Sequence, residues 1–249
     1  MQGKGECAVA HRYFTSDIAE DSARISGADA SHLARVLRAR PGQQLVLCDG
    51  MGMDYEAEIE SVLPEEVRLR VLSKMPTAAE PSIWVDVFIG LSKGERMEWA
   101  VQKAVELGAS AISPFFSENT VVKPKEGAKD KKTERLARIA AEAAKQCGRG
   151  ILPEVKPPMA FSEVLALASQ KEQAMFFYEG GGIPLREALK ATNNIALITG
   201  PEGGFSPAEA VAAREAGCIP VGLGPRILRC ETAPAAALAA VMALTGNLE

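Results

Sequence analysis

The 249-residue sequence predicts an α/β protein in which a small strand-rich unit precedes a larger unit of alternating strands and helices. Residues 12–73 consist mainly of short runs in which apolar and polar residues alternate, which is typical of half-buried strands. After residue 83, apolar runs of strand length alternate with segments of helical spacing. This alternation predicts a mostly parallel sheet with helices on both faces.

The first unit is expected to contain three clear strand signals and one short helix. Residues 30–38 have helical spacing, with Leu33, Val36 and Leu37 on one side and Arg35 and Arg38 off it. Two strand-like runs, 45–48 and 55–62, flank an Asp-Gly turn and predict a hairpin. Residues 66–72 alternate with a period of two, so we expect a further strand and a small sheet or barrel. Residues 75–81 contain two prolines and predict a linker.

The second unit begins with a predicted strand over 83–91. Ser92-Lys93-Gly94-Glu95 then predicts a capping box and a helix that ends at Gly108. A strand over 111–116, a basic loop over 121–130, a helix over 133–147 and a short strand over 175–178 are expected next. Residues 232–244 form an alanine-rich pattern that predicts a closing helix, with Pro234 tolerated in its first turn.

The stretch from 195 to 232 is the most informative part of the second unit. An apolar strand over 195–198 runs into the glycine-rich turn 200–204, and Ser206, Pro207 and Glu209 predict a capped helix that ends at Gly217. A short strand over 219–223 then meets a second Gly-Pro turn. Parallel sheets bind ligands at the carboxyl ends of their strands, so both turns are candidate ligand loops.

Composition narrows the class of protein. Hydrophobic residues make up 47% and charged residues 24% of the chain, as in ordinary globular proteins. The sequence has no apolar run of about 18 residues and no signal-peptide pattern, so we expect a cytoplasmic protein without a membrane partner. Five scattered cysteines without a CxxC pair and only two histidines predict reduced thiols and no metal site.

Basic residues are concentrated in two places although the net charge is −4. Residues 121–150 contain nine Lys or Arg against four acidic residues, and the segment around Arg35, Arg38 and Arg40 contains no acid. Such segments could follow a phosphate backbone. An ordinary solvated surface explains the same charges equally well.

The two turns differ from phosphate-binding loops. Residues 200–204 lack the Lys-Ser/Thr ending of a Walker loop and the pattern GxGxxG, and Glu202 would repel a phosphate. The loop therefore suits a neutral or cationic ligand, or serves as a purely structural turn. In the second turn, Arg229 could hold a phosphate or a base edge. Glu231 could accept a proton or favour the helix N-terminus, whereas a nucleophilic Cys230 is disfavoured because no histidine occurs in this unit.

Four segments together resemble one family. TGPEGGFSPAE, LGPRILRCETA, SKGERMEWAVQKAVELGASAISPFFSE and AAKQCGRG are similar to the RsmE family, the 16S rRNA uridine-N3 methyltransferases of the SPOUT superfamily. The resemblance runs from Arg12 to the end of the chain. It implies an RNA-binding PUA-like β-barrel over 12–74 and a SPOUT domain over 82–249, with a trefoil knot at about 195–249. It also implies S-adenosylmethionine as cofactor, a homodimer, 16S rRNA of the small ribosomal subunit as partner, and uridine 1498 as target. Residues 1–11 would be an N-terminal extension.

Site residues follow from matching this chain to the family motifs. The expected cofactor-binding residues are Ile198, Thr199, Gly200, Pro201, Glu202, Gly203, Gly204, Leu223, Gly224, Arg226, Ile227, Leu228, Arg229, Glu231, Thr232 and Ala233. The expected RNA-binding residues are Arg35, Arg38, Arg40, Arg96, Lys103, Lys123, Gln146 and Arg149.

The reaction itself suggests the catalytic roles. Uridine N3 carries a proton that must leave, so we assign Arg229 as stabiliser of the developing anion, Glu231 as candidate base and Glu202 as second candidate. Two positions depart from the family: Lys145 stands where many members carry glutamate, and Cys230 replaces a common threonine.

Three alternative functions remain open from the sequence. A non-catalytic RNA-binding protein would have lost cofactor binding, although both glycine-rich turns are intact. An α/β enzyme with a nucleotide cofactor would be expected to have a phosphate-binding loop. A methyltransferase of the same fold could act on transfer RNA instead of ribosomal RNA.

Overall fold

A computed structural model describes residues 12–121 and 128–249. Contacts divide the chain into two compact units. The first unit extends to Glu80 and also includes residues 144–152, and the second consists of residues 81–143 and 153–249. The proposed extension 1–11 and the candidate residue Lys123 lie outside the described residues.

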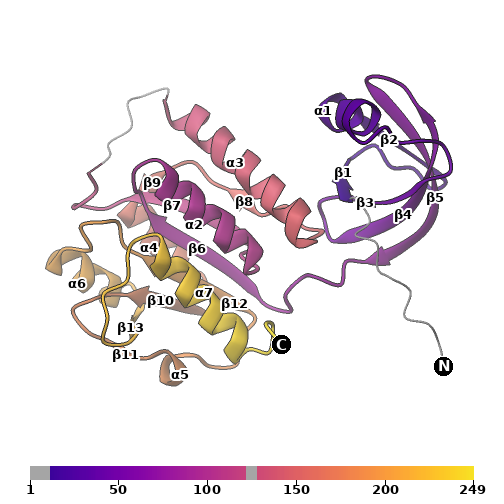
Figure 1. The fold of residues 1–249 in the computed structure, drawn as a ribbon. Coiled ribbons are helices and arrows are strands. Elements are labelled where there is room, and N and C mark those ends of the chain that lie inside the picture. The colour runs from indigo at the N-terminus through magenta and orange to yellow at the C-terminus, as the bar shows by residue number, and fades with distance from the viewer. Residues whose placement is uncertain (1–11, 122–127) are drawn as a thin grey trace. The chain divides into compact units, whose positions relative to one another are not determined.

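The first unit contains a five-stranded sheet (Figure 1). The strands follow the order β1 (Arg12–Phe14), β3 (Gln44–Cys48), β4 (Met53–Val62), β5 (Glu66–Pro76) and β2 (Ser22–Ser26). Only β1 and β3 pair in parallel. The predicted hairpin is confirmed as β3 and β4, and β5 alternates between buried and exposed residues over its first half, as expected for a half-buried strand.

The predicted helix over 30–38 is only partly correct. The chain forms a short α-helix, α1 (Gly27–Ser31), followed by a π-helical turn, η1 (His32–Val36). Leu33 is buried against the sheet, but Val36 is 67% exposed and Leu37 is also exposed. Because π-helical hydrogen bonds span one residue more than α-helical bonds, they rotate Val36 and Leu37 away from the face that Leu33 occupies.

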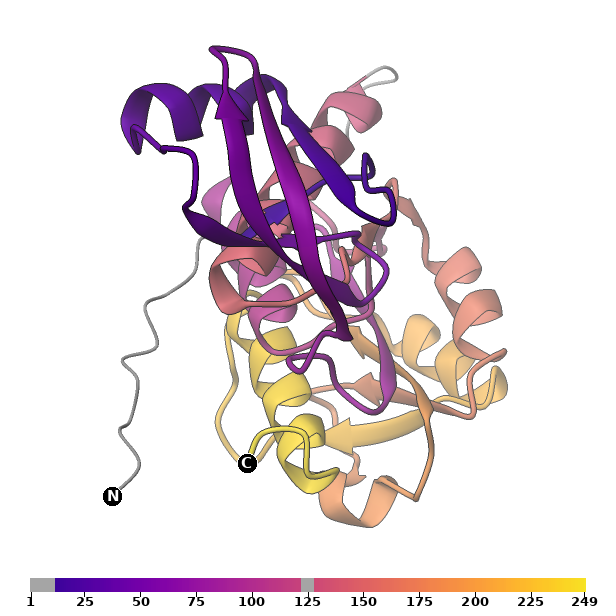
Figure 2. The same cartoon turned by 90° about the vertical axis from the view of Figure 1, so that its right-hand side faces the viewer.

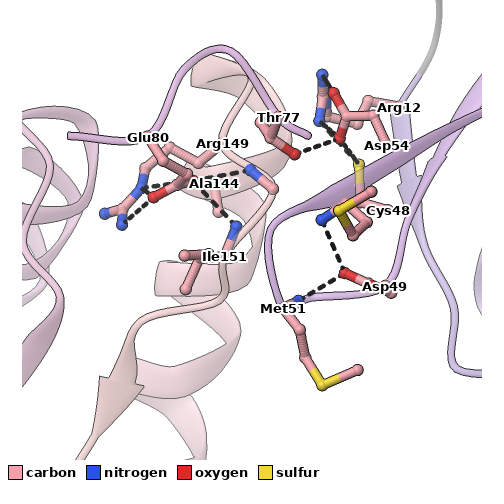
Figure 3. A network of polar contacts seen from close by, with 12 residues as sticks. Arg12, Cys48, Asp49, Met51, Asp54, Thr77, Glu80, Ala144, Arg149 and Ile151 are labelled. Carbon is pink, nitrogen blue, oxygen red and sulfur yellow. Dashed lines mark hydrogen bonds and ion pairs between the residues drawn. The ribbon is translucent and has the colours of Figure 1, made fainter. Parts of the chain in front are cut away.

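Two polar clusters connect distant parts of the first unit (Figure 3). Asp54 accepts hydrogen bonds from both terminal nitrogens of Arg12, at 2.7 and 2.8 Å, and from Thr77 Oγ1 at 2.6 Å. Glu80 accepts from Arg149 Nη2 at 2.8 Å and from two backbone N–H groups in residues 150–151. The region predicted to be a linker is therefore anchored at Thr77 and Glu80, and β5 continues to Pro76.

The second unit is built on a parallel sheet, as predicted. Its strands are β6 (Trp84–Gly90), β7 (Ala111–Phe116), β8 (Glu154–Val155), β9 (Met159–Ala160), β10 (Gln173–Phe177), β11 (Ile183–Pro184), β12 (Asn194–Thr199) and β13 (Ile219–Gly222). Their order is β11-β13-β10-β12-β6-β7-β8, with β9 also paired to β7. All recorded pairings are parallel.

Helices cover both faces of this sheet, which confirms the predicted layering (Figures 1 and 2). The helices are α2 (Glu95–Glu106), α3 (Ala128–Cys147), α4 (Phe161–Ala168), α5 (Leu185–Ala188), α6 (Pro207–Glu215) and α7 (Thr232–Leu244). Helices α4 and α6 share a buried cluster with alternate strand residues, among them Phe88, Phe176 and Ile198. Helix α7 packs against α2 and against strands β6 and β12.

Two local predictions in this unit are wrong. Residues 92–95 form no capping box, because helix α2 starts at Glu95 and its N-cap residue is Gly94, which has no side chain to accept a hydrogen bond. Ser92 is instead buried. Helix α3 begins at Ala128, so the last residues of the expected basic loop are helical.

Candidate functional site

The carboxyl ends of the neighbouring strands β13, β10 and β12 surround a cavity of about 840 Å³. Its walls come from three loops: the segment after β10, the first glycine-rich turn (200–204) and the second turn (223–231). Arg96, in the first turn of α2, closes one side. Loops after parallel strands meet at the same sheet edge, so the topology brings together segments that are distant in sequence.

Local hydrogen bonds fix the first turn. Gly204 N donates to Pro201 O at 3.0 Å, and Asn119 Nδ2 donates to Gly203 O at 3.0 Å. The predicted capping box is confirmed: Glu209 N donates to Ser206 Oγ at 3.2 Å, and Ser206 N donates to Glu209 Oε2 at 2.9 Å. Helix α6 ends at Glu215 with Ala216 as C-cap, and Gly217 follows with a φ of 83°, which confirms its predicted role as the glycine that ends the helix. The turn is thus held at both ends, which preorganises the wall of the cavity.

The cavity brings together most of the candidate cofactor residues. Those that line it are Gly200, Pro201, Glu202, Gly204, Leu223, Gly224, Arg226, Ile227, Leu228, Arg229, Glu231 and Ala233. Ile198, Thr199, Gly203 and Thr232 are not among the lining residues. Thr199 is fully buried, and its hydroxyl donates to Phe88 O at 3.3 Å, so its side chain serves the packing of β12 on β6.

One wall of the cavity consists of residues that were not predicted as site residues from the sequence. The segment after β10 contributes Tyr178, Glu179, Gly181, Gly182, Pro184 and Leu185. The glycine run 180–182 was the available signal, because it follows a predicted strand at the same sheet edge as the two turns. Phe205 and Cys230 also line the cavity.

Arg96 connects the acidic groups on its side of the cavity. Its Nη1 donates to Glu202 Oε1 at 2.5 Å, and this bond raises the pKa of the Arg96 guanidinium, with a smaller contribution from Glu231. Burial acts to raise the pKa of Glu231, but a backbone N–H, the Cys230 thiol, Arg96 and Arg229 outweigh it and lower that pKa. Glu231 is therefore an ionised carboxylate at neutral pH, and a weaker base than an isolated glutamate.

Cys230 is a neutral thiol in this setting. Burial, with added effects of the neighbouring Glu231, raises its pKa to about 11. The thiol donates to Glu231 Oε2 at 3.2 Å. A nucleophilic cysteine must be a thiolate, so this geometry agrees with the sequence argument against cysteine chemistry.

The candidate RNA residues of the first unit have different environments. Arg35, Arg38 and Arg40 are exposed, and Arg38 adopts a φ of 50°, which is uncommon for a residue with a side chain. Gln146 is exposed as well. Arg149 is 3% exposed, and its guanidinium is bound to Glu80, so the expectation that this side chain faces RNA is not retained.

In the second unit, Lys103 forms an ion pair with Glu106 at 2.8 Å, and Arg96 belongs to the cavity. Within residues 12–121 and 128–249, no cluster of three or more His, Cys, Asp or Glu side chains could hold a metal ion. None of the helices described here is long and apolar enough to cross a bilayer.

The chain matches two family models. Residues 79–242 match an RNA methyltransferase domain, and residues 25–72 match an RNA methyltransferase PUA domain. Ribosomal RNA small subunit methyltransferase E of Bacillus subtilis is 35% identical over 225 residues, covering 87% of this chain and 88% of the relative. Its counterpart in Synechocystis is 35% identical over 232 residues, covering 91% of this chain and 75% of the relative.

A solved structure gives the same relationship at the level of the fold. Ribosomal RNA small subunit methyltransferase E of Neisseria gonorrhoeae, bound to S-adenosyl methionine, has a TM-score of 0.85 to this chain at 29% identity. The similarity covers 94% of this chain and 98% of that one.

Proposed function

This chain belongs to the ribosomal RNA small subunit methyltransferase E family, and on that basis we propose that it transfers a methyl group from S-adenosylmethionine to N3 of a uridine in 16S rRNA. By family resemblance the target is uridine 1498. The observation that carries this proposal is the cavity, which the two family loops line at the carboxyl ends of β12 and β13. The Neisseria relative is bound to S-adenosyl methionine.

The residues present fit a cationic cofactor without phosphate. Three carboxylates, Glu179, Glu202 and Glu231, line the cavity together with glycine-rich backbone. When bound, S-adenosylmethionine supplies an electrophilic methyl group on a positively charged sulfur. The proposed cofactor-binding set is the family set named above. Ile198, Thr199, Gly203 and Thr232 do not line the cavity and belong to the set through the family resemblance alone.

Arg229 and Glu231 supply the chemistry for the uridine. Arg229 is exposed at the mouth of the cavity, where a guanidinium can stabilise negative charge that develops on O2 or O4. Glu231 is ionised and can accept the N3 proton. Its lowered pKa makes it a weak base, so the proposed reaction depends on charge stabilisation by Arg229 as well as on proton transfer. Glu202 is engaged with Arg96 and remains the second candidate base.

RNA recognition is assigned to both units. In the first, Arg35, Arg38 and Arg40 are exposed, and for these three no ion pair with a described residue is recorded, which suits phosphate contacts. Gln146 is a further candidate there. In the second, Arg96 lies beside the cavity, and Lys103 and Lys123 complete the proposed set.

The remaining family features are also proposals. We expect residues 12–74 and 82–249 to act as the RNA-binding and catalytic domains, and residues 195–249 to form a trefoil knot. We also expect a homodimer in the cytoplasm. Exposed apolar side chains on two packed helices support the homodimer: Trp99 of α2 is 41% exposed and Leu244 of α7 is 42% exposed.

Incubation with labelled S-adenosylmethionine and either small ribosomal subunits or naked 16S rRNA tests the proposal. Incorporation into one of these substrates, and not into transfer RNA, is the expected result. If the protein binds the cofactor but labels neither substrate, the rRNA target is wrong. If it binds no cofactor at all, the non-catalytic RNA-binding alternative is favoured.

A further inference from the structure

Glu179 belongs to the cavity but has no role in the reaction described above. It follows β10 directly after Tyr178, and it lines the cavity opposite the side closed by Arg96. No hydrogen bond or ion pair is recorded between its carboxylate and any residue of the described parts of the chain. The other two carboxylates of the cavity do have partners: Glu202 binds Arg96, and Glu231 accepts from Cys230.

Gly204 fixes where the Glu179 carboxylate lies. A Cβ atom placed on Gly204 would approach Glu179 Oε1 to 2.5 Å, so the carboxylate lies directly against the first glycine-rich turn. Gly204 also has a φ of +64°, a conformation that favours glycine. The loop that carries Glu179 is held in turn by Gly182, whose backbone lies so close to that of Pro220 that a Cβ there would come within 2.6 Å.

Strand order separates the charges of the cavity. In the sheet, the strands lie in the order β13-β10-β12-β6, and the first turn follows β12. Glu179 follows β10, so it lies on one side of this turn. Arg96 follows β6, on the other side, and draws Glu202 toward itself. Glu231 also lies within the electrostatic reach of Arg96. Although Glu231 follows β13, it is therefore on the β6 side with Arg96. Arg229 is within electrostatic reach of Glu231, whereas Glu179 is on the β10 side.

We propose that Glu179 binds the ribose hydroxyl groups of the cofactor. The reacting methyl group must face Arg229 and Glu231, so the nucleoside part extends toward β10. A carboxylate can accept hydrogen bonds from two vicinal hydroxyls, and acidic residues recognise the ribose of dinucleotides in the same way. This inference rests on the proposed function, because it assumes that S-adenosylmethionine occupies the cavity.

The test compares three ligands by titration calorimetry with wild-type protein and the variant Glu179→Gln. S-adenosylmethionine, S-adenosylhomocysteine and 5′-methylthioadenosine all contain the ribose, but only the first two contain the amino-acid part. Loss of a hydrogen bond to a charged acceptor should weaken all three by about tenfold or more. Glu215→Gln, a change of an exposed carboxylate on α6 outside the cavity, should leave all three dissociation constants unchanged.

The three other possible results of these titrations each contradict a different part of the proposal. If Glu179→Gln weakens the first two ligands and spares methylthioadenosine, Glu179 binds the ammonium group and the ribose assignment is wrong. If the variant binds all three as the wild type does, Glu179 does not contact the cofactor, while the proposed function stands. If the wild-type protein itself binds none of the three, the proposed function fails together with its cofactor. Circular dichroism of Glu179→Gln checks that its fold is intact.

Discussion

Among single residues, Arg229 has the most specific proposed role, which is to stabilise the developing negative charge on the uridine. It lines the cavity at an exposed position and lies close enough to Glu231 to help lower the pKa of that carboxyl. Arg229→Ala should reduce kcat by about 10²- to 10³-fold, the usual cost of losing one group that stabilises a developing anion. Methyl transfer measured under single-turnover conditions gives this value.

The matched control for Arg229 is Arg214→Ala, which removes an exposed arginine of α6 that does not line the cavity. It should keep wild-type turnover. Arg229→Ala should also keep the wild-type circular dichroism spectrum and thermal midpoint. Full turnover by Arg229→Ala would remove this residue from the mechanism.

The contribution of Asp54 to the stability of the folded protein should depend on pH. Burial acts to raise its pKa, but hydrogen bonds from Arg12 and Thr77 outweigh burial and lower it. A carboxyl with a lowered pKa in the folded state contributes stability above its unfolded pKa of about 3.9, and this contribution is lost as the pH falls through the folded pKa. Asp54→Asn should therefore destabilise the protein at pH 7 by about 3 kcal/mol, the lower end of the cost of breaking a buried pair.

The difference between wild type and Asp54→Asn should shrink below about pH 4, because the carboxyl of the unfolded chain then takes up a proton, and the loss is complete once the pH falls below the lowered pKa of the folded state. Thermal unfolding followed at pH 7 and at pH 3 measures both values. Glu58→Gln breaks an exposed ion pair with Arg70 in the same sheet and should cost about 0.5 kcal/mol or less. An equal loss for Asp54→Asn at both pH values would contradict the linkage argument.

At the scale of elements, the cap of α6 connects the stability of a helix to the shape of the cavity. Ser206→Ala removes the acceptor for Glu209 N, which should cost about 1 kcal/mol. Glu209 also accepts from Glu118 N at 2.8 Å, so the cap ties the first turn to the loop after β7. The variant should lower the thermal midpoint and weaken cofactor binding.

Ser169→Ala provides the control for the cap, because its hydroxyl only donates to Ala166 O at the end of α4. It should change neither the thermal midpoint nor the cofactor affinity by much. If Ser206→Ala behaves like this control, the capping box contributes nothing to the cavity.

Elements could be predicted from the sequence where the residues that determine them are close together in the chain. The Ser206–Glu209 box and the bounds of α7 follow from residues within one or two helical turns, and both predictions are confirmed. The same pattern at Ser92 and Glu95 is wrong because the helix begins one residue after Gly94, which has no side chain to form a cap. The π-helical turn at 32–36 has no periodicity signal of its own, so the predicted common side of Leu33, Val36 and Leu37 is wrong.

The same rule explains the site. Both glycine-rich turns could be assigned because each is one continuous motif. Glu179 could not, since its place beside Gly204 depends on β10 and β12 being neighbours. Arg149 was assigned to RNA from a family motif, and its burial could not be predicted because its partner Glu80 is 69 residues away in the sequence. Burial of an arginine by a distant acid has no local signature.

Considered as a complete enzyme, the protein must also bind RNA, and we expect its first unit to do so through three exposed arginines without a recorded ion pair to the described residues. The triple variant Arg35→Ala, Arg38→Ala and Arg40→Ala should weaken binding to 16S rRNA fragments and reduce the slope of log K against log salt by about 2 to 3. Filter binding at several salt concentrations gives the slope.

Arg24, Arg68 and Arg70 form the matched control, because they belong to the same unit but each is ion-paired with an acid. Replacing all three by alanine removes the same formal charge, yet it should change the salt slope less. Equal slopes for the two triple variants would mean that net charge, and not the segment 35–40, determines RNA affinity.

The most direct test of the central claim is the identity of the modified nucleoside. Small ribosomal subunits that lack the modification are incubated with the protein and S-adenosylmethionine, and the 16S rRNA is digested and examined by mass spectrometry. We expect N3-methyluridine at a single site, formed about 10²- to 10³-fold more slowly by Arg229→Ala. A different methylated nucleoside, or N3-methyluridine spread over many sites, would contradict the proposed reaction.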